Sequence, residues 1–103
     1  MAATRFSRPV EIPDDFGDRP AAVRTGRVTL PNRIAWSGQG EYDLDDPNDR
    51  RRVCELVMTE GTEDDVRTYI DPDILLGIWD TMWLAPHVRE QWTAHLRSRD
   101  LVP

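Results

Sequence analysis

The sequence contains no lysine and a single cysteine, Cys54, among its 103 residues. All thirteen basic residues are therefore arginines, whose planar guanidinium groups favour directional, bidentate ion pairs. One cysteine excludes an internal disulfide framework and fits a reducing compartment, so we expect a cytoplasmic protein. No apolar run approaches the roughly 18 residues that span a bilayer, and the N-terminus has no apolar signal-peptide region, so we expect no membrane contact.

Motifs that would indicate catalysis are also missing. The sequence has no glycine-rich phosphate loop, no nucleophile elbow, and no Ser or Cys spaced suggestively from a histidine. His87 and His95 are more than two helical turns apart, too far to share a zinc ion. A calcium loop that starts at Asp43 would need oxygen ligands and glycine where the chain has Pro47, Asn48 and Cys54. We therefore expect no enzyme activity, no metal and no cofactor.

Charge is unevenly distributed along the chain. Residues 1–36 carry six arginines and four acidic residues, whereas residues 37–103 carry seven arginines and fifteen acidic residues. The acidic part is a poor binder of phosphate, which supplies most non-specific affinity for nucleic acid. It is better suited to a basic groove on another protein.

The first 40 residues read as an arm. Residues 1–26 hold three prolines and no helical or strand period, which predicts a flexible or extended segment; its apolar residues could instead anchor it on another surface. Polar and apolar residues alternate over 27–30 and 33–36, which predicts a two-stranded ribbon around Pro31 and Asn32. Residues 37–40 read as a hinge. We divide the chain into an arm, 1–40, and an acidic helical domain, 41–103.

Helix boundaries are marked clearly in the acidic domain. Asp46 and Asp71 are predicted N-caps, each followed by proline, and Thr62 with Asp65 forms a capping box. Gly61 suits a left-handed residue after a helix. These signals, with Pro86, predict helices over 47–60, 63–70, 72–83 and 86–99. The predicted fold is mainly α, a small bundle of about four short helices with an extended N-terminal arm and a short β-ribbon.

The third predicted helix is apolar over a wide arc. Leu75, Ile78 and Met82 form one stripe, and Trp79 and Trp83 form a second at i and i+4. Such a helix lies centrally in the core or presents one face to a partner, and core packing is the alternative for each tryptophan. The residues we select as candidate partner contacts are Trp79, Trp83, Arg51, Asp64, Asp65 and Trp36.

From about Leu30 onward the chain resembles a group of small actinobacterial proteins. The pattern consists of Ile34-x-Trp36, Tyr42 to Pro47, Arg50 to Val53, Glu60 to Arg67, Tyr69 to Asp71, Leu84-x-Pro86, Val88-Arg89 and Trp92. The group resembles cognate antitoxins of nucleotidyltransferase toxins of the AbiEii-like class. That resemblance implies a protein partner, the toxin, which would bind nucleotide and magnesium and modify RNA. It transfers no functional residue by position.

Two function classes follow. The first is a protein-binding antitoxin whose acidic body covers a basic cleft, with Trp79 and Trp83 as apolar anchors. The alternative is a small helical DNA-binding or transcription-regulatory accessory protein, because three short helices with sharp corners can resemble a helix-turn-helix. The predicted starts of the second and third helices carry Glu63, Asp64, Asp65, Asp71 and Asp73, the wrong sign for phosphate. We therefore expect no direct binding of nucleic acid.

Overall fold

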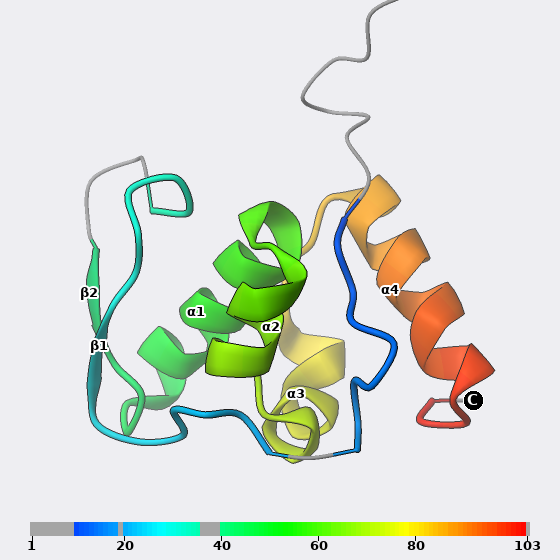
Figure 1. The fold of residues 1–103 in the computed structure, drawn as a ribbon, viewed down its shortest axis with the longest axis horizontal. Coiled ribbons are helices and arrows are strands. Elements are labelled where there is room, and N and C mark those ends of the chain that lie inside the picture. The colour runs from blue at the N-terminus through cyan, green and yellow to red at the C-terminus, as the bar shows by residue number, and fades with distance from the viewer. Residues whose placement is uncertain (1–9, 19, 36–39, 103) are drawn as a thin grey trace, which may run out of the picture.

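Helices make up most of the acidic part of the chain, and their caps explain where they begin. The computed structural model describes residues 10–18, 20–35 and 40–102. Within these residues four α-helices follow one another: α1 (Pro47–Glu60), α2 (Glu63–Tyr69), α3 (Pro72–Ile78) and α4 (Pro86–Ser98) (Figure 1). The Asp46 and Asp71 side chains accept hydrogen bonds from the first turns of α1 and α3. Thr62 and Asp65 form the capping box of α2. The predicted mainly α fold with a short ribbon is confirmed.

The third helix is shorter than predicted. It ends at Ile78, and the chain continues as a 3-10 helix, η2 (Trp79–Thr81), and then as extended backbone from Met82. Arg89 of α4 donates hydrogen bonds to the carbonyl oxygens of Trp79 and Met82, at 3.4 and 2.6 Å. These tertiary bonds satisfy carbonyl groups at the end of a helix, where intrahelical partners are missing. The prediction that Trp79 and Trp83 share a helical stripe is therefore wrong.

The ribbon also differs from the prediction. Strand β1 (Arg27–Thr29) pairs antiparallel with β2 (Glu41–Asp43), so that Val28 lies opposite Tyr42. Residues 32–34 form a turn instead of the second strand, with Ile34 and Ala35 donating backbone hydrogen bonds to Pro31. Because Ile34 is fully buried, this turn serves the core and is not available for strand pairing. The predicted hinge lies outside the described residues except for Gly40.

Residue Gly61, between α1 and α2, has extended backbone, with φ of −79° and ψ of 160°. The predicted left-handed conformation is therefore wrong. Glycine is nevertheless required there, because a Cβ atom would lie 2.7 Å from the Val57 carbonyl oxygen. The sharp corner between the two helices depends on this close approach.

One core joins the helices to the segment that precedes them. Trp92 of α4 is fully buried, and its indole nitrogen donates a hydrogen bond of 3.1 Å to the Met58 carbonyl of α1. Phe16, Leu30 and Ile34 belong to the same buried cluster as the helical side chains. The segment 10–18 runs alongside α4 (Figure 1), and the Val10 amide donates to the Gln91 side chain of that helix. No helix among the described residues is long and apolar enough to cross a membrane.

Candidate protein-binding surface

Trp83 is the one large apolar side chain that the described residues leave open to solvent, with 74% of its surface exposed. It lies in the extended segment between Met82 and Leu84, both of which are buried. Successive side chains of extended backbone point to opposite sides. Burial of Met82 and Leu84 therefore turns the indole of Trp83 outward.

The backbone that carries Trp83 is held from two helices. The Trp83 amide donates a hydrogen bond of 2.8 Å to the Glu55 carboxylate of α1, and Arg89 of α4 donates to the Met82 carbonyl. The first bond joins residues 28 apart in the sequence and the second joins residues seven apart, so the segment is held from both helices. The exposed indole thus stands on a fixed base, which lowers the entropy that a partner must remove on binding.

Arg51 lies on the same side of α1 as the residue that holds Trp83. Arg51 and Glu55 are spaced i and i+4, so their side chains are neighbours on the helix surface. Arg51 is half-buried, and its guanidinium lies 3.4 Å from the Asn48 side-chain oxygen. Arg52 forms a 3.6 Å ion pair with Glu55. Arg51 therefore lies one turn from the residue that holds Trp83, but its guanidinium is directed at Asn48 and not at Trp83.

Trp79 has a different setting. It lies in η2, it is half-buried against the core, and the Arg89 guanidinium sits over its ring at 4.7 Å from the ring centre. A guanidinium over an indole face is a favourable cation–π arrangement. Trp79 thus supports Arg89, which in turn holds the base of Trp83. The remaining predicted tryptophan contact, Trp36, lies outside the described residues.

Asp64 and Asp65 are adjacent in α2 but lie in opposite environments. The Asp64 side chain is 92% exposed and pairs with Arg67 at 3.1 Å. The Asp65 side chain is buried, and it accepts hydrogen bonds from the Thr62 amide at 2.8 Å and from Arg33 at 2.5 and 2.8 Å. Asp64 is therefore available to a partner at the surface, whereas the contacts of Asp65 are inside the fold.

The bidentate pair of Arg33 and Asp65 fixes the charge of both groups. Hydrogen bonds from Arg33 are the main reason that the pKa of Asp65 is lowered to about 2, with bonds from Thr62 acting in the same direction and burial opposing them. The same pair raises the pKa of Arg33. The ion pair ties the 32–34 turn to the start of α2, which is a structural role.

Exposed acidic side chains outnumber exposed arginines over residues 40–102. The exposed arginines of this part are Arg52, Arg67 and Arg97, whereas the exposed acidic residues are Glu41, Asp45, Asp46, Glu63, Asp64, Asp73, Asp80, Glu90 and Asp100. Asp80 lies three residues before Trp83. The part of the chain that carries the indole therefore has an excess of exposed negative charge, which favours a basic partner.

No reactive centre forms elsewhere in the described part of the chain. Burial raises the pKa of the Cys54 thiol to about 12, which keeps the group protonated and unreactive. No three His, Cys, Asp or Glu side chains gather as ligands for a metal ion among the described residues.

Sequence reasoning missed Glu55 and Arg89, the two residues that hold the base of Trp83. Both look like ordinary charged surface residues, because their partners are backbone groups of η2 and the segment after it. Gly77 followed by the polar pair Asp80 and Thr81 is the signal that could have placed the end of α3 earlier. No sequence signal identifies Arg89 as its partner.

Comparisons with protein families, with curated proteins and with solved structures find no match for this chain. The resemblance to antitoxins therefore stays a prediction. The function of the chain therefore has to be argued from the residues that the fold exposes.

Proposed function

We propose that this chain is a protein-binding antitoxin that neutralises a nucleotidyltransferase toxin by direct contact. The observation that carries the proposal is the exposed indole of Trp83 on a backbone fixed by Glu55 and Arg89. Tryptophan is among the residues most enriched at the energetic centres of protein interfaces. A fixed, exposed indole is costly to keep in water and gains most when a partner covers it.

Charge supports the choice of partner. A toxin that modifies RNA has a basic cleft, and the helical body that carries Trp83 is strongly acidic. In this arrangement Trp83 is the apolar anchor, and Arg51 and Asp64 are further contacts that the partner would reach on α1 and α2. The acidic starts of α2 and α3 disfavour the alternative of DNA binding.

The first test is capture of the tagged full chain from its native host, followed by mass spectrometry of the proteins that elute with it. We expect a near-stoichiometric nucleotidyltransferase whose transfer of nucleotides to RNA is blocked by the chain. Trp83→Ala should weaken the purified complex by roughly 30-fold or more, as loss of an interface anchor does.

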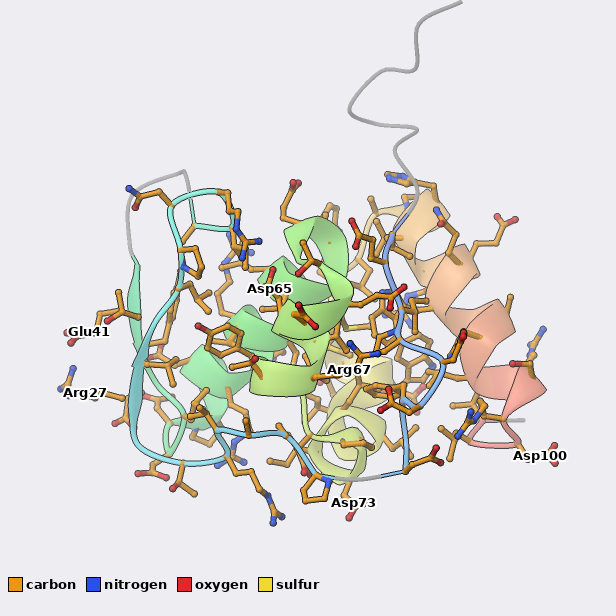
Figure 2. The ribbon with its side chains drawn as sticks, viewed as in Figure 1. Arg27, Glu41, Asp65, Arg67, Asp73 and Asp100 are labelled. Atoms are coloured by element: carbon orange, nitrogen blue, oxygen red, sulfur yellow. The ribbon has the colours of Figure 1, made fainter. Side chains whose placement is uncertain are left out.

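The matched control is Glu41→Gln on the ribbon, which changes an exposed side chain that lies far from α3 and α4 in Figure 2. It should leave the affinity unchanged. Capture of no nucleotidyltransferase, or an affinity that Trp83→Ala does not change, would contradict the proposal. A salt-dependent shift of DNA by the chain alone would favour the regulatory alternative.

A further inference from the structure

Strand β1 has an edge that faces away from β2. Next to the strand, the Leu30 amide donates a hydrogen bond of 2.7 Å to the Gly40 carbonyl. Bonded and non-bonded pairs alternate along an antiparallel ladder, so Val28 is bonded across the ribbon and the residues on either side of it are not. The amide and carbonyl groups of Arg27 and Thr29 therefore point outward, away from β2.

The two edges of the ribbon differ. On β2 the start of α1 closes the edge, because the Asp43 amide donates to the Asp49 side chain at 3.0 Å and the Asp43 carbonyl accepts from the Asp46 amide at 3.0 Å. The outward backbone groups of Arg27 and Thr29 have no hydrogen bond to any part of the chain that the structure describes. The β1 edge thus keeps donors and acceptors that can extend the sheet.

The β1 edge is also accessible. The ribbon lies at one margin of the molecule, apart from α3 and α4 (Figure 1). Arg27 and Thr29 are exposed, and the Arg27 side chain points away from the helices (Figure 2). The strand contains no proline and no bulge, the features that block pairing at other sheet edges. The charge of Arg27 is compensated within the ribbon by Glu41, at 3.3 Å.

We infer that a second copy of this chain pairs with the β1 edge, so that the two ribbons form one sheet around a two-fold axis at Val28. Strand β1 runs antiparallel to β1 of the second copy, and Arg27 of each copy lies opposite Thr29 of the other. Each of these Arg27–Thr29 pairs exchanges two backbone hydrogen bonds. A two-fold contact of this kind is closed, so association stops at the dimer.

Charge and proline select this register. With Arg27 opposite Thr29, no like charges are adjacent across the outer face of the sheet. Each row of side chains there consists of Glu41 and Thr29 of one copy, then Arg27 and Asp43 of the other. A shift that places Arg27 opposite Arg27 would bring two guanidinium groups together. The opposite shift would place Arg27 opposite Pro31, which has no amide to donate.

Sedimentation equilibrium of the full chain tests the inference. We expect a monomer–dimer equilibrium with a Kd between about 10 μM and 1 mM, because the contact is small and is formed mainly by backbone bonds. Amide hydrogen exchange locates the contact. The Arg27 and Thr29 amides should exchange more slowly at about 1 mM chain than at about 20 μM, whereas the Asp43 amide, which is already bonded, should not change.

The variant Thr29→Arg tests the register. It places a guanidinium opposite Arg27 of the second copy and should weaken the dimer about fivefold, as like charges that face each other do. Each monomer should stay folded, because the new side chain lies opposite Glu41 of its own ribbon. Combining Thr29→Arg with Arg27→Thr exchanges the two residues, so that arginine again faces threonine, and should restore the wild-type Kd.

The control for net charge is Asp73→Asn on α3. It alters the charge by the same amount as Thr29→Arg, but at an exposed residue that lies apart from the ribbon (Figure 2). The Kd of the dimer should stay at its wild-type value in this variant.

Four results would overturn the inference. They are a chain that stays monomeric up to about 1 mM, a wild-type Kd in Thr29→Arg, no restoration in the exchanged variant, and exchange protection that centres on Trp83. The inference is independent of the proposed antitoxin role, since it uses none of the residues around Trp83. Monomeric Thr29→Arg should still capture the toxin, so failure of one proposal is distinguishable from failure of the other.

Discussion

Phe16 meets Trp92 edge-on, with 5.3 Å between the ring centres and 83° between the ring planes. This is a preferred geometry for aromatic pairs. Trp92 is fully buried and bonded to Met58 of α1, so Phe16 closes a core that α1 and α4 share. The segment 10–18 is therefore part of the hydrophobic core.

The first prediction concerns this pair. Phe16→Ala should lower the free energy of unfolding by about 3 to 4 kcal/mol, because it removes a buried ring and leaves a cavity beside Trp92. Trp83→Ala is the control, since it removes a larger aromatic that is exposed, and it should change stability by less than about 0.5 kcal/mol. Urea unfolding followed by circular dichroism measures both. Equal losses for the two variants would contradict the placement of Phe16.

The second prediction concerns pH. The folded state lowers the pKa of Asp65 from 3.8 to about 2, so its ion pair with Arg33 contributes fully above about pH 5. That contribution is lost as the pH falls from about 5 towards 2. We expect the ion pair to contribute about 1 to 2 kcal/mol to the free energy of unfolding, because the Arg33 side chain is half exposed and screening weakens the pair.

Urea unfolding at several pH values tests this contribution. Asp65→Asn should flatten the decline in stability between about pH 5 and 2, because the titrating carboxylate is gone. Asp64→Asn is the control: it removes the neighbouring exposed carboxylate and should keep nearly the wild-type slope. A wild-type slope in Asp65→Asn would show that the pair with Arg33 does not lower the pKa.

The third prediction uses two glycines. Gly61→Ala places a Cβ atom 2.7 Å from the Val57 carbonyl oxygen and 3.0 Å from the Asp65 Cβ, so it should cost about 1 to 3 kcal/mol of stability. Gly77→Ala in α3 meets no atom within 4 Å and should stabilise the chain by about 0.5 to 1 kcal/mol through helix propensity. If thermal unfolding shows that both substitutions change the stability in the same direction, the close corner between α1 and α2 is contradicted.

Local signals predicted the helices well where they were strong. The start of each α-helix is confirmed at the predicted residue, as are the N-caps Asp46 and Asp71 and the Thr62 capping box. These features depend on hydrogen bonds within a few residues of sequence. The predicted ends of α1, α2 and α4 agree with the structure to within one residue.

Local signals did not predict which residues from separate elements pair with one another. Strand β1 pairs across a gap in sequence with β2, and Trp83 leaves the helix because Arg89 and Glu55 bind the backbone around it. Of the candidate contacts, Asp65 was distinguished from Asp64 by its predicted capping box with Thr62, but its burial and its ion pair with Arg33 were not predicted. In the structure Asp65 pairs with Arg33 of the 32–34 turn, whereas Asp64 stays exposed.

The sequence by itself determined the helical class, the helix starts and the acidic character of the body, because caps, prolines and charges act over short distances or by simple composition. Tertiary structure alone decided which tryptophan is exposed, which aspartate is buried, and that the segment 10–18 joins the core. Those outcomes depend on contacts between residues far apart in the chain, such as Phe16 with Trp92 and Arg33 with Asp65. Helical periodicity indicates which face is apolar, but the burial of a single side chain depends on such contacts.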